Sequence, residues 1–375
     1  MSDPQNKPLI PPHIEEENSL TEGYLRYSGR KSLILVAIAM AIVVMATYSI
    51  GLGATDLTYG EIVHYILHPD GSWNSSVIWD SRLPKTVAAL VIGTALGISG
   101  AVMQAVLRNP MASPFTLGVS NASAFGAAIG IVLGGGVVVT NVESSYPLVQ
   151  NEMFVTICAF LAALLSICII LGLIKAINAT PETIVLSGMA ITSIFGAGLS
   201  FLQYMADEQS MAMIVFWQFG SIDKVSWDHI AIIATVTSVA LAYFAFKAWD
   251  YNSMETGDET ARGLGINLER TRIVALVVSA LVTSLAVSFT GIIGFIGLIA
   301  PHIVKKLVGN DFRFVLAGSA LVGAAVLLVS SMVASYAFSD ILYTSLPVGI
   351  LTSALGGPLF LFILYTSSKR RSRRC

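Results

Sequence analysis

Residues 273–304 read IVALVVSALVTSLAVSFTGIIGFIGLIAPHIV and contain no Asp, Glu, Lys or Arg. A membrane-spanning helix needs about 20 apolar residues, so this stretch is long enough for one crossing or, if it turns, for two short ones. Its second half contains Gly291, Gly294, Gly297 and Pro301, and these residue types often interrupt helices. The number of crossings made here decides the topology of the whole chain.

The whole chain is poor in charge. Of its 375 residues, 44 are charged, or 12%, and 55% are hydrophobic, whereas soluble domains have about 25% charged residues. A charged side chain at the bilayer centre costs roughly 2.5 to 3.5 kcal/mol, so stretches without charge mark candidate membrane spans. Nine such stretches occur, bounded by charged residues: 31–56, 85–108, 108–143, 152–175, 182–207, 228–247, 272–305, 313–340 and 340–369. The pattern predicts an all-α, multi-pass membrane protein.

The two chain ends settle the ambiguity at 273–304. The N-terminal tail ends in RKS and the C-terminal tail reads KRRSRR, and basic flanks favour the cytoplasmic side. Two cytoplasmic ends require an even number of crossings, so we split the stretch at SFTGIIG and predict ten transmembrane helices. This topology places 18 of the 21 Lys and Arg residues on the cytoplasmic side, the exceptions being Arg82, Lys85 and Lys224.

These crossings give a simple domain plan. We predict a polar cytoplasmic tail over 1–31, a ten-helix domain over 32–368 with a cytoplasmic loop at 248–271, and a basic cytoplasmic tail over 369–375. The expected location is the cell (cytoplasmic or inner) membrane. A further apolar run, SMAMIVFWQFG at 210–220, is too short to span and predicts a half-helix on the outer side.

Several chemistries are disfavoured by the residues that the spans lack. Ion-coupled transporters keep ionisable residues inside their spans, and here only His229 and His302 lie in the stretches, near their ends. No GxxxxGK[ST] loop occurs, so ATP hydrolysis is not expected on this chain. Glu61, His64 and His68 have a conceivable metal-ligand spacing, but an amphipathic surface helix explains the same pattern. We therefore predict no catalytic residue, no metal and no cofactor.

The loop at 248–271 is the longest and most charged of the cytoplasmic loops between spans. Its sequence predicts two short helices, with Thr256 or Asp258 capping the second one and Gly263 and Gly265 ending it. A solvated linker would share this composition. The small residues around the second helix favour a compact knob on which another protein docks.

At this point the chain resembles a known family. GDETARGLG at 257–265 is similar to the coupling-helix motif G-E-x-A-x-x-L-G of FecCD-type permeases, which belong to ABC importers for vitamin B12, iron-siderophores and haem. Further stretches agree in order: RLPKTVAALVIGTALGISGAVMQAVLRNPMASPFTLGVSNASAFGA from Arg82, GIIGFIGLIAPHIVKKLVGND from Gly291 and LPVGILTSALGGPLFLFIL from Leu346. The resemblance covers roughly residues 50–368 and implies the type II ABC importer permease fold, which has ten helices.

The resemblance also implies partners. Such permeases pair with a second copy or a close paralogue, two ATPase subunits dock from the cytoplasm, and an extracytoplasmic binding protein delivers the substrate. ATP hydrolysis then lies on the separate subunits, so this chain is not itself an enzyme. The implied ATPase contacts are Gly257, Asp258, Glu259, Ala261, Arg262, Leu264 and Gly265.

On the outer face, the family's R-L-P-R motif binds acidic residues of the binding protein, and here it reads Arg82-Leu83-Pro84-Lys85. Snorkelling at a helix end would explain the same residues, and Lys85 lacks the bidentate geometry of arginine. Relatives can carry a third arginine where this chain has Asp340. The implied cytoplasmic gate is Asn109 and Met111 with Pro181 and Glu182, although a plain helix-ending turn also explains the first pair.

The resulting prediction is a permease subunit that imports an iron(III) chelate, either a siderophore complex or haem. A cobalamin importer is the alternative. An ion-coupled secondary transporter fits less well because it needs ionisable residues within the spans. A membrane protein without transport activity fits less well because it would not need the coupling-helix motif GDETARGLG.

Overall fold

The computed structural model describes residues 12–53, 55, 57–134, 137–138, 148–149, 151–177, 180–336 and 345–372. Asp340 and residues 1–11 of the predicted N-terminal tail therefore lie outside the described residues. Seven described helices are long and apolar enough to cross a membrane. They are α1 (Pro12–Gly51), α4 (Leu83–Val106), α6 (Glu152–Ile177), α7 (Pro181–Met205), α9 (Trp227–Phe246), α12 (Leu268–Thr290) and α14 (Phe312–Tyr336).

Three further helices complete the bundle: α5 (Val119–Leu133), α13 (Ile296–Val308) and α16 (Val348–Ser372). Within the described residues these ten helices match the ten predicted crossings, so the all-α prediction is confirmed. The only strands among the described residues are β1 (Val137–Val138) and β2 (Leu148–Val149), which have two residues each and pair with each other antiparallel.

The stretch 273–304 divides into two helices at the predicted turn. α12 ends at Thr290 and α13 begins at Ile296, with non-helical backbone between them. Gly291 has a φ of +76°, and a Cβ at this position would clash with the carbonyl oxygen of Trp217. Glycine is therefore required here both for its backbone conformation and for the close approach of a neighbouring chain segment.

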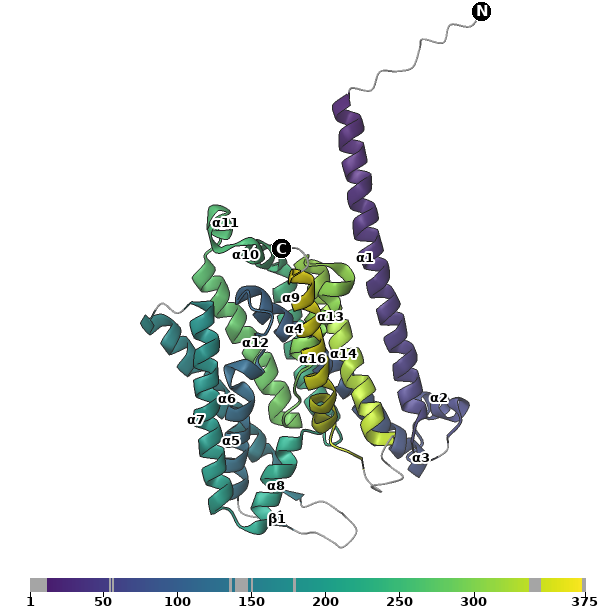
Figure 1. Cartoon of the computed structure of the whole chain (residues 1–375). Coiled ribbons are helices and arrows are strands. Elements are labelled where there is room, and N and C mark those ends of the chain that lie inside the picture. Colours follow the sequence, from purple (N-terminus) through teal and green to yellow (C-terminus); the bar gives the residue numbers. More distant parts are fainter. Residues whose placement is uncertain are drawn as a thin grey trace, which may run out of the picture.

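The short elements lie at opposite ends of the bundle (Figure 1). At one end lie α10 (Ala248–Thr256) and α11 (Asp258–Gly263), close to where α16 ends; α1 also begins on this side. At the other end lie α2 (Tyr59–Leu67), α3 (Trp73–Ser76) and α8 (Glu208–Phe219). The predicted half-helix thus forms as α8, on the side opposite α10 and α11.

Much of the segment predicted as a polar tail over 1–31 is helical and forms the start of α1. α1 starts at Pro12, so helical backbone runs through much of the polar segment before entering the apolar one. In Figure 1 α1 stands at the edge of the bundle and extends beyond it on the α11 side. It packs mainly against α14, and only a small share of its apolar stretch is buried.

α4 is the central helix, and glycines let its neighbours approach closely. A Cβ added at Gly97 would clash with the carbonyl oxygen of Ser319 in α14, and one at Gly100 would clash with that of Gly297 in α13. Small residues at such crossings let helix backbones come into direct van der Waals contact. Eighteen of the 24 residues of α4 are buried, so its position fixes the ends that carry the functional loops.

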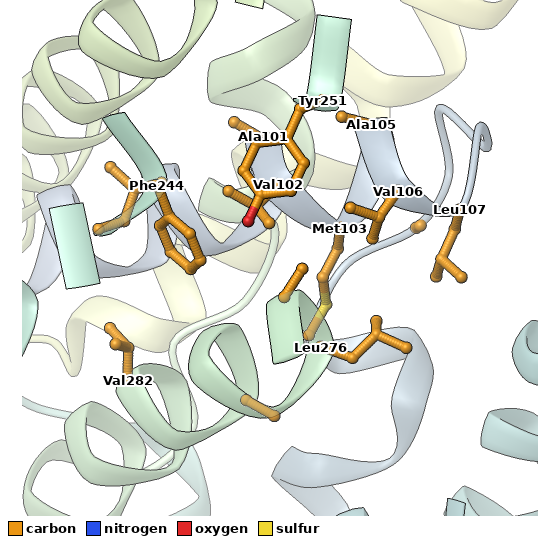
Figure 2. Packing of buried hydrophobic residues seen from close by; sticks show 14 of the residues in the cluster. Ala101, Val102, Met103, Ala105, Val106, Leu107, Phe244, Tyr251, Leu276 and Val282 are labelled. Atoms are coloured by element: carbon orange, nitrogen blue, oxygen red, sulfur yellow. The ribbon is translucent and has the colours of Figure 1, made fainter. Parts of the chain in front are cut away.

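The core continues into the α10–α11 end (Figure 2). Tyr251 of α10 is fully buried, with its ring 5.1 Å from that of Phe312 and 6.3 Å from that of Phe244. Figure 2 shows Tyr251 and Phe244 in the same buried cluster as Val102 and Met103 of α4. The loop at 248–271 is therefore built into the bundle by its first helix rather than being a solvated linker.

Candidate coupling site and gate

The loop at 248–271 forms the two predicted short helices, but its caps differ from the prediction. The N-cap of α11 is Gly257, with a φ of +147° and no side-chain cap. Capping by Thr256 or Asp258 is therefore wrong: the Thr256 hydroxyl donates to the carbonyl of Ser253 at 2.7 Å, and the Asp258 carboxylate is engaged elsewhere. Gly257 avoids the steric cost that a side chain would impose at that φ.

The end of α11 follows a Schellman pattern. The Gly265 N–H donates to the carbonyl of Arg262 at 2.9 Å, and the Ile266 N–H donates to that of Ala261 at 3.1 Å. Gly265 has a φ of +83°, the left-handed conformation that this motif needs. The predicted stop at Gly263 and Gly265 is thus confirmed, with Gly263 as the last helical residue.

Only part of the predicted ATPase contact set faces outward. Of this set, Glu259, Arg262 and Gly265 are exposed, and Leu264 is 66% exposed. Ala261, by contrast, is fully buried within the core. α11 therefore has an anchoring residue on one side and an outward surface that combines an acid, a base and an apolar side chain on the other.

α10 holds this element rigidly against the bundle. The Lys305 ammonium donates to the Glu255 carboxylate at 2.7 Å. The Asn252 side chain accepts from the Phe312 N–H at 2.6 Å and donates to Asp311 at 3.2 Å. These contacts join α10 to α13 and to the start of α14.

Asp258 is the charged residue among the predicted contacts that turns inward. Its carboxylate lies 3.5 Å from the Arg272 guanidinium and 3.8 Å from that of Arg108. The sequence reasoning missed both arginines. One signal was available for Arg108: it follows the last turn of α4 directly, where a glycine is the common residue.

The predicted gate residues lie where two helices meet the α11 end. The Asn109 side chain accepts from the Met111 N–H at 2.9 Å, directly after α4, and Met111 is exposed. Pro181 and Glu182 form the first turn of α7, which Thr180 caps by accepting from the Thr183 N–H at 3.4 Å. Proline is favoured at this first helical position. The gate role of the four residues stays a prediction.

On the opposite face, the two predicted docking residues have partners within the chain. The Arg82 side chain is 7% exposed and donates to the carbonyls of Ile50 at 3.1 Å and Thr55 at 2.6 Å, which lie at and after the end of α1. Lys85 forms an ion pair with Asp223. Their docking role stays a prediction, and for Arg82 it requires the side chain to leave these carbonyls.

The third outer cation, Lys224, is exposed and lines a cavity of about 260 Å³ with Glu152 and His229. The alternative metal spacing on α2 is not realised, because the Glu61 carboxylate accepts from the Thr58 N–H at 2.8 Å in a capping box. Throughout the described residues, no group of three or more His, Cys, Asp or Glu side chains could hold a metal ion.

Comparison with known proteins adds the following. The model of the FecCD transport family matches residues 39–366. A Methanocaldococcus jannaschii protein named provisionally as an ABC transporter permease is 41% identical over 94% of this chain and 99% of its own length. The hemin transport system permease protein HmuU of Yersinia pestis is 32% identical over 91% and 97%. Other relatives are named as permeases of Fe(3+)-citrate and vitamin B12 import systems.

Among solved structures, one described as an inward-facing conformation of a metal-chelate type ABC transporter, itself provisionally assigned, superposes with a TM-score of 0.74. It is 27% identical and covers 89% of this chain and 99% of its own.

Proposed function

This chain belongs to the FecCD transport family of ABC importer permeases, and from that premise we propose that it imports an iron(III) chelate, either a siderophore complex or haem. ATP hydrolysis lies on separate ATPase subunits, and a binding protein outside the membrane delivers the chelate. Both chain termini lie in the cytoplasm.

The outward surface of α11 is the observation that carries the proposal. An exposed leucine flanked by Glu259 and Arg262, on a helix anchored through Ala261, offers an apolar centre with a polar rim. Protein interfaces commonly combine these two features. The surface lies at the end of the bundle where 18 of the 21 basic residues were placed by the topology, as expected for a cytoplasmic ATPase contact.

The rest of the assembly follows from this contact. Two copies of the chain, or this chain and a close paralogue, form the translocation path between them, and each binds one ATPase subunit. Closure of the ATPase pair around ATP moves the two α11 helices as parts of rigid bodies, which switches the side on which the path is open. Asn109 and Met111, with Pro181 and Glu182, form the cytoplasmic gate of this path.

Co-purification tests the ATPase contact. The chain is co-expressed with its candidate ATPase subunit, and Leu264→Asp is compared with Leu67→Asp. Leu67 is 67% exposed but lies in α2 at the opposite end of the bundle. We expect Leu264→Asp to abolish recovery of the ATPase and Leu67→Asp to leave it intact. Equal recovery with both variants would refute the contact.

Uptake by proteoliposomes tests the substrate. The complex is supplied with its binding protein loaded with a radiolabelled ferric siderophore, hemin or cobalamin. ATP-dependent accumulation of an iron complex supports the proposal, and accumulation of cobalamin alone identifies the alternative substrate. The alternative rests on relatives named for vitamin B12 import.

A further inference from the structure

Three charged side chains meet where α11 joins the bundle, and each comes from a different element. Asp258 begins α11, Arg108 follows α4 and Arg272 lies in the first turns of α12. Glu182, at the start of α7, lies within electrostatic range of Arg272 and Arg108. Asp258 thus pairs with two arginines, and this cluster contains a residue of α11 and the residue next to Asn109.

Arg108 adopts a backbone conformation that is unfavourable for an arginine. Its φ is +47°, in the left-handed region. Its N–H donates to the carbonyl of Ala105 and that of Asn109 donates to Gln104, both at 3.2 Å. This is the same Schellman pattern that Gly265 completes at the end of α11. Strained residues persist where the surrounding structure or the function requires the side chain, so the arginine at this position needs an explanation.

The two arginines differ in freedom. Arg272 has a side chain that is 12% exposed, and its Nε donates to the carbonyl of Val106 at 3.0 Å. The Arg108 side chain is 45% exposed and lines a cavity of about 590 Å³ with Glu255 and Lys305. Arg272 therefore holds α12 to the end of α4 by a mostly buried hydrogen bond, whereas the Arg108 side chain has room to move with Asp258.

We propose that Asp258 is a positioning residue inside the permease, which transmits the movement of α11 through Arg108 and Arg272 to the gate segment at 109–111, rather than a contact with the ATPase. This inference rests on the proposed function. A shift of α11 displaces the carboxylate that Arg108 faces, and Asn109 follows Arg108 directly in the chain. Arg272 keeps the end of α4 in place, so the displacement bends the turn at 108–111 instead of moving the helix.

The test measures gate movement in the complex of full-length chain and ATPase subunit, without a transport substrate. Cys158, Cys168 and Cys375 are replaced by serine, and Met111→Cys is introduced as a reporter. The rate at which a maleimide labels this cysteine is then measured with and without ATP. In the otherwise unchanged chain, ATP is expected to change the labelling rate.

The key variant is Arg108→Gly, because glycine adopts the left-handed conformation without strain. If Arg108 took no part in transmission, this variant would melt at the same temperature or higher and its gate would still respond to ATP. The proposal predicts the same thermal stability, full recovery of the ATPase and continued ATP hydrolysis, but equal labelling rates with and without ATP. Asp258→Asn should give the same loss of response, and Arg108→Lys should retain part of it.

Lys175→Gln is the control, since Lys175 is an exposed cation at the end of α6, outside the cluster. It should keep the full ATP response. Loss of ATPase binding in Asp258→Asn, or a normal ATP response in Arg108→Gly, would overturn the inference while leaving the proposed function intact. An unchanged chain that binds no ATPase subunit would refute the proposed function and the inference together.

Discussion

The packing of α4 against α14 gives a prediction whose size can be worked out from the structure. In Gly97→Ala the new methyl group lies well inside 3.0 Å of the Ser319 carbonyl oxygen, and this neighbour is backbone, which cannot rotate away. Overpacking of this kind costs about 1 to 3 kcal/mol. Separating the helices by about 0.5 to 1 Å would forfeit a quarter to a half of each contact's dispersion energy along the seam.

The matched control is Gly172→Ala in α6, where an added Cβ meets no atom within 4 Å. Both substitutions gain up to about 1 kcal/mol of helix propensity. We therefore expect Gly97→Ala to lose about 1 kcal/mol of unfolding free energy net, from about 2 kcal/mol of overpacking less about 1 kcal/mol of helix propensity, and Gly172→Ala to lose none.

Equilibrium unfolding in sodium dodecyl sulfate, followed by the fluorescence of the five tryptophans, measures the difference. The reasoning would be refuted if Gly97→Ala were as stable as the unchanged chain, or if the two variants shifted equally. In that outcome the close approach of α4 and α14 would not exist in the folded protein.

Three further predictions concern charged residues. Arg82→Ala should destabilise the fold by about 2 to 3 kcal/mol, because it leaves the carbonyls at the end of α1 without their charged donor; an unchanged melting temperature would contradict this. Lys85→Gln should cost less than about 1 kcal/mol, since its pair with Asp223 is partly exposed, so loss of uptake with an intact fold would assign Lys85 to docking. Partial burial raises the pKa of Asp311, but hydrogen bonds from Arg313 and Asn252 outweigh it and the pKa is lowered. That stabilisation is complete above the unfolded pKa of about 3.9 and is lost as the pH falls through the lower folded value; Asp311→Asn should lack this acid-sensitive component when unfolding is followed between about pH 3 and 7.

Much of the architecture could be predicted because it depends on local composition. A span needs a run of uncharged residues, and basic flanks set the side on which it begins, so the topology follows from residue order alone. The division of 273–304 was predicted for this reason, as was the half-helix expected at 210–220, which forms as α8. The caps of α11 were not, because Thr256 and Asp258 had better hydrogen-bond partners that the local sequence does not reveal.

The candidate functional sites were likewise predicted only in part. Sequence similarity located the segments around 257–265, 109–111 and 181–182, and the alternation of Ala261 with Glu259 and Arg262 suits a helix with one face buried. Similarity could not indicate the direction of each side chain. Asp258 belongs to the same motif as Glu259, yet it faces two arginines that are 150 and 14 residues away in the chain. Arg82 was predicted to bind an external partner, and similarity could not indicate that its side chain also donates to the carbonyls of Ile50 and Thr55.

The sequence by itself therefore determined that the chain is an all-α membrane protein, where its crossings lie and which family it belongs to. These properties follow from the cost of charge in lipid and from motifs that are contiguous in the chain. Only the tertiary structure decided which charges pair, since Coulomb interactions act between groups that are close in space regardless of their separation in the chain. The cluster of Arg108, Asp258 and Arg272 exists only because three helix ends converge at one end of the bundle.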